Sequence, residues 1–560
     1  MSHEATPPLR IALLCDGYFF EGWAAGCVKE VMSLPGVEIV LLITEEENNA
    51  PASSFAGKVS NYPYRNFLWR FHKRFRLKTS FFETVSLKQE LKDVPLISCK
   101  PGLKGKYSQY FSSNDIETIR SHRPDIILRF AFNILRGEIL TVAKYGVWSF
   151  HHSDEQVIRG GPPAFWEIYK NIPVTGAILQ RLTEKLDAGI ILRKGFFPTV
   201  FHSYKENLEQ LLEGTSSWMK QAIIDVQHGN SPSLNGKPVE TNAPVYSFPK
   251  NFQVLRLRRK LFFRKMHFHF RELFQPESWN IGMAKQPVAD VLSNGTLENI
   301  QWLPESPSNE YKADPFGWKE NGALKIVYEK YSYKKQKGVL AVSDEKGNEK
   351  IVLEAKMHLS YPFVPERSDD KNSNRVILPE SSASSTVFCF DSENPKNGKV
   401  LLKDVDAIDP TILFFNQKWW MFCTIEGKLN NTALHIYHAE NFEGPWLPHA
   451  NNPVKCDVRS SRPGGTPFMH HGKIYRPAQD CSVSYGSAIV LNEIVKLDET
   501  SFEEKIFRRI PPAPEWKNNK GLHTFSIAGD YILFDAKRYR FNFDNFRQIF
   551  SRKIKRFFHK

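Results

Sequence analysis

A loose motif recurs five times in the second half of the chain, and it constrains the fold more than any other feature. Each copy sets polar or aromatic residues beside proline or glycine: ADPFGW, SYPFV, IDPTILF, RPGGTPF and GLHTFSI. Their reference residues are spaced by 47, 48, 53 and 61 positions and are Asp314, Tyr361, Asp409, Arg462 and His523. These intervals are close to the length of a four-stranded propeller blade. The pattern predicts an all-β propeller with five blades.

The segment 1–230 carries a different pattern, in which apolar strands alternate with helical segments. RIALLCD and VEIVLLIT flank a segment with helical spacing, and TGAILQRL and GIILRKGFFP follow as further strand candidates. This alternation is typical of a parallel sheet covered by helices. Since no GxGxxG follows the first strand, the sequence does not support a dinucleotide site. We expect a Rossmann-like α/β domain here.

Polar residues gather at the end of one of these strands, in GVWSFHHSDEQVIRGGPP at 146–163. Thr175-Gly176 and then LDAGI at 186–190 follow in order. Together these motifs resemble the catalytic half of formyltransferases that use 10-formyltetrahydrofolate, a group that acts on methionyl-tRNA, glycinamide ribonucleotide and amino sugars. The family pattern is Asn-x-His at a strand end with an Asp in a later LDxG turn. His151 and Asp187, 36 positions apart, match that pattern.

The chemistry of formyl transfer needs these residue types. The formyl oxygen gains negative charge and needs a hydrogen-bond donor, and the attacking amine must lose a proton to a base. An imidazole serves either step, and a carboxylate fixes its tautomer, so His151 and Asp187 are the expected catalytic pair. Ser149 stands where the family has asparagine. Two readings stay open: His152 compensates for the shorter serine, or the site has lost catalysis.

The resemblance also implies residues that bind the substrate or the folate cofactor. Two of them lie in PDIILRFAFNIL, which resembles the folate-side strand and loop of the family, and the full set is Phe130, Phe132, His152, Ser153, Arg159 and Gly160. Arg159 either anchors a substrate or fixes its loop, and Gly160 fits loop geometry. The seven cysteines never form CxxC, which argues against a zinc site, and no metal is predicted.

The propeller half has resemblances of its own. Its Asp-Pro motifs in the first and third blades look like the superfamily of family 43 glycoside hydrolases, levansucrases and invertases. SYPFV, ILPESS, RPGGTPF and YRPAQDCSVSYG resemble, over about 278–535, the N-terminal domain of plant glucosamine inositolphosphorylceramide transferases and bacterial relatives.

Three carboxylates share the channel in the hydrolase relatives, and glycoside hydrolysis needs one protonated and one ionised carboxyl group. By position, the candidates are Asp314, Glu380 and Asp409. Polar groups able to bind a sugar or phosphate are Arg462, Arg476, Asp480 and His523. The alternative is that Asp-Pro is an ordinary turn pair and that the channel is polar only because water fills it.

The net charge of +14 is concentrated in three segments, 65–78, 253–274 and the tail 541–560. In the tail, aromatic and aliphatic residues recur at helical spacing, as Phe543, Phe546, Phe550, Ile554 and Phe557. Such a basic aromatic helix lies on an anionic membrane surface or packs on its own domain. We expect no nucleic-acid partner, because no recognisable module for one is present.

The sequence predicts a formyltransferase-like domain at 1–230, a basic aromatic linker at 231–277, a five-bladed propeller at 278–540 and the tail. With no secretory signal or apolar span of bilayer length, a cytoplasmic protein is expected. The expected activity is formyl transfer from 10-formyltetrahydrofolate to an amino sugar of surface glycans, with a propeller that binds or processes the glycan. The alternative is a glycan-active propeller beside a degenerate formyltransferase domain.

Overall fold

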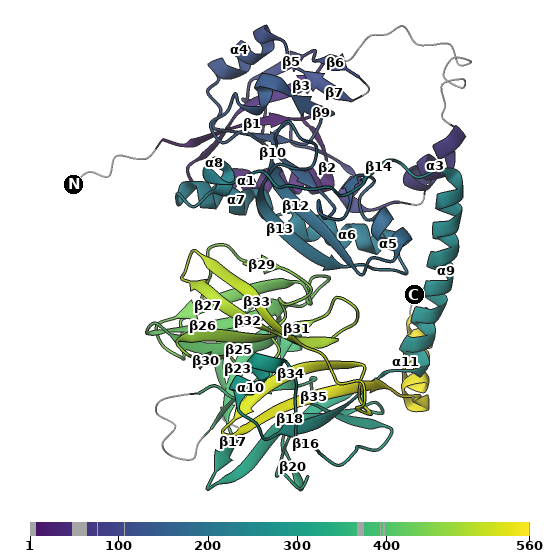
Figure 1. The fold of residues 1–560 in the computed structure, drawn as a ribbon, viewed down its shortest axis with the longest axis vertical. Coiled ribbons are helices and arrows are strands. Elements are labelled where there is room, and N and C mark those ends of the chain that lie inside the picture. The colour runs from purple at the N-terminus through teal and green to yellow at the C-terminus, as the bar shows by residue number, and fades with distance from the viewer. Residues whose placement is uncertain are drawn as a thin grey trace, which may run out of the picture. The chain divides into compact units, whose positions relative to one another are not determined.

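The computed structural model describes residues 7–46, 64–75, 77–105, 107–366, 375–392, 394–395 and 398–558. The chain forms two compact units, one up to Arg264 and the other from Lys265 onward. The boundary falls inside the long helix α9 (Asn251–Phe274). Figure 1 shows the elements of each unit along the chain.

A seven-stranded sheet forms the centre of the first unit, in the order β13-β12-β10-β8-β1-β3-β5. Its five strands from β10 to β5 are parallel, and β12 and β13 are antiparallel to their neighbours. The strands are β1 (Leu9–Leu14), β3 (Val37–Glu45), β5 (Leu96–Cys99), β8 (Ile126–Arg129), β10 (Val147–His151), β12 (Val174–Arg181) and β13 (Ile190–Pro198). The predicted Rossmann-like α/β fold is confirmed.

Helices and short strands complete this unit. The helices are α1 (Gly22–Met32), α3 (Phe67–Phe75), α4 (Ser113–Ser121), α5 (Phe165–Lys170), α6 (Tyr204–Thr215), α7 (Trp218–Gln227) and α8 (Pro232–Asn235). The short strands are β2 (Phe19–Glu21), β4 (Thr84–Ser86), β6 (Gly102–Lys104), β7 (Ser108–Tyr110), β9 (Ile134–Arg136), β11 (Arg159–Gly160) and β14 (Val245–Tyr246).

The segment 231–277, predicted as a linker, contains regular structure. β14 pairs in parallel with β11, and Val254 and Leu257 of α9 are buried in a hydrophobic cluster of the first unit. A strand of two residues such as β14 is too short to show a periodic pattern in the sequence. The prediction for this segment therefore rested on its composition, which suggested a linker. None of the described helices, α9 included, combines the length and the hydropathy needed to cross a bilayer.

Over its described residues, the second unit contains five antiparallel sheets, each with a ladder of four strands, which confirms the predicted five blades. Four sheets run in chain order: β17 (Glu310–Glu320), β18 (Ala323–Ser332), β19 (Lys337–Ser343), β20 (Glu349–Leu353); β21 (Ser360–Phe363), β22 (Val376–Glu380), β23 (Thr386–Asp391), β24 (Lys399–Lys403); β25 (Ala407–Phe415), β26 (Lys418–Ile425), β27 (Ala433–Ala439), β28 (Leu447–Pro448); β30 (Phe468–His470), β31 (Lys473–Asp480), β32 (Ala488–Leu497), β33 (Phe502–Ile510). The short strand β29 (Lys455–Cys456) pairs with β27.

The fifth sheet joins distant parts of the second unit. Its order is β16-β15-β35-β34, so the first strand of the unit, β15 (Glu277–Ala284), pairs with the last strand, β35 (Tyr531–Tyr539). Its outer members are β16 (Ile300–Trp302) and β34 (Gly521–Ala528), and helix α10 (Val288–Asn294) lies between β15 and β16 in the chain.

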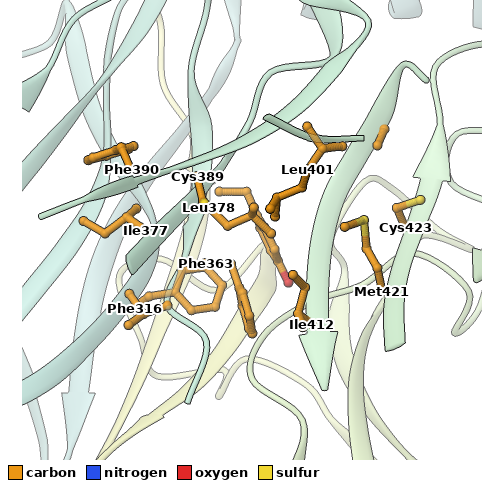
Figure 2. Packing of buried hydrophobic residues seen from close by; sticks show 14 of the residues in the cluster. Phe316, Phe363, Ile377, Leu378, Cys389, Phe390, Leu401, Ile412, Met421 and Cys423 are labelled. Atoms are coloured by element: carbon orange, nitrogen blue, oxygen red, sulfur yellow. The ribbon is translucent and has the colours of Figure 1, made fainter. Parts of the chain in front are cut away.

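Hydrophobic side chains fill the space between neighbouring blades. Figure 2 shows Phe316, Phe363 and Ile412, from the first strands of three successive blades, in one buried cluster. Packing sheet against sheet in this way removes apolar surface that no single blade could bury alone.

The recurrent motif produces the same irregularity in several blades. Asp314, Tyr361 and Asp409 adopt positive φ angles of 52°, 43° and 50°, and the pairing register shifts at each of these positions. Such a bulge re-aims the side chain of the residue that it displaces. The Asp-Pro and Tyr-Pro copies are therefore repeated bulges in the first strands of three successive blades.

Tyr361 connects three blades through its phenol. Its hydroxyl lies 2.9 Å from Thr411 Oγ1 and accepts a 2.8 Å hydrogen bond from the backbone N–H of Gly465. The ring is fully buried. Because burial excludes water from this position, solvent cannot take over the polar contacts of the phenol.

We expect Tyr361→Phe to lower the free energy of unfolding by about 1–3 kcal/mol, because it leaves a buried N–H without its acceptor. Urea unfolding of the full chain measures this change. Tyr64→Phe, at a ring that is 71% exposed, is the matched control and should leave the midpoint unchanged. Equal midpoints for both variants would contradict the connecting role.

The tail forms helix α11 (Phe543–Phe558). Phe546 stacks on Phe274 with ring centroids 4.9 Å apart, whereas Phe543 and Phe550 are 59% and 53% exposed. Ile554 and Phe557 of the predicted stripe lie outside the residues whose side chains the structure describes. The tail helix thus packs on its own unit through at least one of its aromatic residues.

Candidate functional site

A cavity of about 290 Å³ lies in the first unit, where the carboxyl ends of β8 and β10 meet the loop between β12 and β13. Its lining includes Arg129, Ser149, His151, Gly160 and Asp187. Open α/β sheets bind ligands at the carboxyl ends of their strands. The cavity therefore brings the predicted catalytic residues together at the place where the fold favours a site.

His151 and Asp187 face each other in this cavity. Nδ1 of His151 is 3.5 Å from Oδ1 of Asp187, and Nε2 lies 3.0 Å from the carbonyl oxygen of Ile158. Because a carbonyl only accepts, Nε2 carries the hydrogen. Nδ1 is then the ring nitrogen with a free lone pair, and it is the one that faces the Asp187 carboxylate.

Asp187 is held in place by the loop that follows β10. Its Oδ2 accepts a 2.9 Å hydrogen bond from the backbone N–H of Gly160. At Gly160 φ is +79°, and an added Cβ would come within 2.2 Å of the Tyr246 carbonyl oxygen. Glycine is therefore required by backbone geometry and close approach at this position.

Arg129 lies beside Ser149, the residue that replaces the asparagine donor of the family pattern. Its Nη1 donates a 2.9 Å hydrogen bond to Ser149 Oγ, and Nη2 donates to the carbonyl oxygens of Phe132 and Asn133. Its Nε is buried and has no hydrogen-bond partner in the described part of the chain. Burial lowers the pKa of Arg129, and the charge of Asp187 opposes that shift. A cation with one unused donor thus lines the cavity.

His152 and Ser153 do not line this cavity. His152 stands edge-on against Trp23, with ring centroids 5.6 Å apart, and its Nε2 lies 3.3 Å from Thr215 Oγ1. Burial, reinforced by His151, lowers its pKa to about 3, so the ring is neutral. Ser153 is buried and donates a hydrogen bond to Glu167. Of the two readings left open for Ser149, this placement does not favour compensation by His152, because successive side chains of an extended chain point to opposite faces.

Three other predicted binding residues also have structural contacts. Phe130 packs against Trp23 and Phe132 against Phe111, with ring centroids 6.0 and 5.5 Å apart. Arg159 donates a hydrogen bond to a backbone carbonyl of the segment that leads into β14. Of the alternatives for Arg159, this contact favours a fixed loop residue.

In the propeller, His523 lies between two carboxylates. Its Nε2 is 3.0 Å from Oδ1 of Asp314, and its Nδ1 is 2.7 Å from Oδ1 of Asp535. Burial alone would lower the pKa of His523, but the two carboxylates outweigh it and raise the pKa to about 10. The ligand atoms of the three residues lie within 4.8 Å of one another. A protonated imidazole, however, has no lone pair to offer a metal ion.

A second group surrounds Asp409. Its Oδ2 accepts hydrogen bonds from Arg462 Nε at 2.6 Å and from Gln479 Nε2 at 2.8 Å. Burial and the neighbouring charge of Asp409 raise the pKa of Glu380 well above its ordinary value. At Asp314, burial acts in the opposite direction to the charge of His523, and the net effect lowers its pKa. The pKa of Glu380 is thus shifted upward and that of Asp314 downward, the directions that a general acid and a base require.

Arg476 and Asp480 do not join these groups. Arg476 is fully buried and pairs with Glu504 at 2.7 Å. Asp480 pairs with Arg509 at 2.8 Å. The partners Glu504 and Arg509 lie on β33, the fourth strand of the same blade. The grouping expected from sequence is corrected here, because both side chains pair outward within their own sheet.

Comparison with known proteins separates the two units. Residues 260–521 match the family described as glucosamine inositolphosphorylceramide transferase 1, N-terminal. The protein of that name from Oryza sativa subsp. japonica is 36% identical over 111 residues, which are 19% of this chain and 15% of the relative. A methionyl-tRNA formyltransferase from Halalkalibacterium halodurans is 27% identical over 214 residues, 38% of this chain and 63% of the relative. The chain joins a formyltransferase-like domain to a domain of this N-terminal kind.

Solved structures show low overall similarity to the whole chain. A glycinamide ribonucleotide transformylase from Symbiobacterium toebii has 14% identity and a TM-score of 0.27, and covers 40% of this chain and 89% of its own. A thermostable family-43 glycoside hydrolase has 13% identity and a TM-score of 0.28, and covers 36% and 76%.

Sequence reasoning missed two charged residues of these sites. In the formyltransferase-like domain, Arg129 ends the apolar run of β8 and carries no motif. In the propeller, Asp535 lies in β35 and accepts hydrogen bonds from the backbone of Asp314 and His523. The signal that could have found them is a charged residue at the end of, or inside, an otherwise apolar strand.

The shifted pKa of His523 predicts a loss of stability in alkaline solution. Its folded-state pKa of about 10 exceeds the ordinary value of 6.5. The stabilisation is therefore full below pH 6.5 and is lost as the pH rises toward 10, on the order of 1 kcal/mol per pH unit. Urea unfolding at intervals from pH 6.5 to 10 measures it. His523→Gln should flatten this dependence, and a wild-type curve no steeper than that of the variant would show the assignment to be wrong.

Proposed function

We propose that the formyltransferase-like domain transfers a formyl group from 10-formyltetrahydrofolate to the amine of an amino sugar. The observation that carries this proposal is the His151–Asp187 pair in the 290 Å³ cavity. Similarity to methionyl-tRNA formyltransferases supports the reaction type. The acceptor class rests on the relative named glucosamine inositolphosphorylceramide transferase, since glucosamine is an amino sugar.

The residues present suit the donor. A cavity of this volume is at the low end for a small-molecule site, so it accommodates the formyl-bearing part of the folate. Arg129 is one of the lining residues, and its buried Nε–H has no acceptor among the described residues. Such a group is costly to leave unpaired, and the formyl oxygen is an acceptor of suitable size and polarity.

In this reaction the amine nitrogen bonds to the formyl carbon, and the bond from that carbon to the folate nitrogen breaks. His151 takes the proton of the amine on Nδ1, toward Asp187, and can return it to the departing nitrogen. Arg129, positioned by Ser149, donates to the formyl oxygen as negative charge develops on it. The products are an N-formyl amino sugar and tetrahydrofolate.

The test incubates the purified full chain with 10-formyltetrahydrofolate and a panel of amino sugars, free and nucleotide-linked, and scores the formyl product by mass. We expect one member of the panel to gain the mass of a formyl group with equimolar release of tetrahydrofolate. Absence of product, together with no folate binding by calorimetry, would remove the proposal.

A second candidate function belongs to the propeller. The opposite pKa shifts of Glu380 and Asp314 favour acid and base roles in a glycan reaction. In that case the formyltransferase-like domain is non-catalytic, and Arg129 only fills the space beside Ser149. Loss of glycan turnover in Asp314→Asn and Glu380→Gln, with no formyl transfer by the wild type, would favour this function.

We also propose that the tail helix α11 contacts a membrane. Phe543 and Phe550 leave an exposed aromatic face on α11, which would suit peripheral contact with an anionic membrane.

A further inference from the structure

A second and larger cavity lies in the first unit, outside the site around His151. Its volume is about 1230 Å³, and it is lined by α3 and by parts of the segments 77–83 and 247–250. Among the described residues that line it, Glu83 is the only carboxylate. The lining cations are Arg65, Arg70, Lys73, Arg74, Lys78 and Lys250.

Helix α3 presents one face to this cavity. Trp69 and Lys73 are four residues apart, as are Arg70 and Arg74, and this is the spacing that puts side chains on one side of a helix. Trp69 is 5% exposed and packs edge-on against Phe165 at 5.4 Å. This buried ring packs α3 against the domain. The cations of α3 that line the cavity are therefore carried by an anchored helix.

The segment 247–250, which also lines the cavity, and the start of α9 are joined to the start of α3 by hydrogen bonds. Asn66 Nδ2 donates to the carbonyl oxygen of Phe248 at 3.0 Å, and Asn251 Oδ1 accepts from the backbone N–H of Leu68 at 2.9 Å. Figure 1 shows α3 beside the first turns of α9 accordingly. The cavity is therefore a formed feature of the domain.

The cavity combines an excess of positive charge with aromatic surface. Cations that line one cavity repel one another, and a bound anion relieves that repulsion. Arginine and lysine are the usual ligands of phosphate oxygens. Phe248, 61% exposed, and Tyr107 offer flat apolar faces in the same lining. We propose that this cavity binds a phosphate-bearing ligand, with the phosphates on the cations and the organic part against Phe248 and Tyr107.

The cavity is connected to the catalytic pair through two short strands. The segment 247–250 continues directly from β14, and Tyr246 of β14 accepts a hydrogen bond from Gly161 N at 3.1 Å. Gly160, beside it on β11, donates to Asp187. If the proposed formyl transfer holds, on which this step rests, the ligand is a phosphate-linked acceptor, and its binding fixes the loop that positions Asp187.

Two sources share this phosphate chemistry: a free nucleoside diphosphate, and the headgroup of an anionic phospholipid. Phe67, Phe71 and Phe75 occur every four residues along α3, offset from the cavity-lining positions, and are 49%, 43% and 56% exposed. An exposed aromatic stripe beside cations also suits a membrane interface. The experiment separates these sources.

Calorimetry of the full chain tests binding of inorganic pyrophosphate and of uridine diphosphate. Co-sedimentation tests vesicles of phosphatidylcholine with phosphatidylserine against vesicles of phosphatidylcholine alone. Because charge-assisted hydrogen bonds are lost, the double variant Lys73→Ala with Arg74→Ala should weaken binding by about tenfold or more. Lys88→Ala with Lys92→Ala, two exposed lysines of the same domain outside the cavity, is the matched control and should bind as the wild type does.

Saturable binding of pyrophosphate and uridine diphosphate, weakened only by the cavity variant, supports the proposal with a soluble ligand. Binding only to anionic vesicles, reduced by the cavity variant and by Phe67→Ser with Phe71→Ser, supports it with a lipid headgroup. No binding in any arm, or equal binding by both double variants, overturns it. Binding without formyl transfer would remove the proposed function alone, and formyl transfer without binding would remove this inference alone.

Discussion

Replacement of His151 by alanine is expected to lower kcat for formyl transfer by about 10²–10⁴-fold, because the base that accepts the amine proton is lost. Nδ1 of His151 lies 3.5 Å from the Asp187 carboxylate and is the ring atom not engaged with the Ile158 carbonyl. No other described imidazole lines the cavity. Initial rates at saturating folate and acceptor measure the change.

His228→Ala is the control, since this side chain is exposed beyond the end of α7, and it should retain the wild-type rate. A urea midpoint for His151→Ala within experimental error of the wild type separates loss of chemistry from loss of folding. Retention of more than a tenth of the wild-type rate would show that His151 is not the base.

Replacement of Arg129 by methionine is expected to lower the rate by about 10²–10³-fold, the usual effect of removing an oxyanion donor. The prediction follows from the buried Nε of Arg129, which has no partner among the residues that the structure describes, and from its hydrogen bond to Ser149. Methionine has similar length and no charge. The loss should fall on kcat, with little change in KM for the folate, because the donor acts on charge that develops during the reaction.

The conservative variant Arg129→Lys should recover part of this loss, since a single ammonium supplies the charge but cannot contact Ser149 and two carbonyls together. Arg120→Met, on the exposed face of α4, is the matched control. An increase in rate or in folate affinity on removing Arg129 would contradict the donor role and would identify the guanidinium as an obstruction of the site.

The repeated motif predicted the five blades because its copies recur at about the length of one blade, and three of them mark a bulge with a short Asp-Pro or Tyr-Pro sequence. It also predicted Asp314, Asp409 and His523 as channel residues; Asp314 contacts His523, whereas Asp409 contacts Arg462. Arg476 could not be placed in the same way, because strand alternation alone does not say which face of a blade meets the channel. Its partner Glu504 lies on another strand, β33, which carries no copy of the motif.

In the first unit, the resemblance to the formyltransferase pattern predicted the pairing of His151 with Asp187, and the two side chains lie 3.5 Å apart. The supporting contacts were not predictable, because β11 and β14 are very short strands that lie far apart in the chain and have no periodicity. Arg129 was missed for a related reason. The apolar sequence of its strand, β8, predicts a buried strand and gives no sign of a functional residue. The role of Arg129 depends on its contact with Ser149 in the neighbouring strand β10.

The shared sheet of β15 and β35 sets the order in which the molecule can be completed during synthesis. β15 leaves the ribosome before the strands of the other four blades, and its partner β35 leaves after all of them. The blades in between can form hairpins as they emerge, but the ring has no closing pair until the last strands are made. The described strands of the first unit, by contrast, all precede α9. Domains generally fold as units as they emerge, so the formyltransferase-like domain can complete its core while the second half of the chain is still being translated.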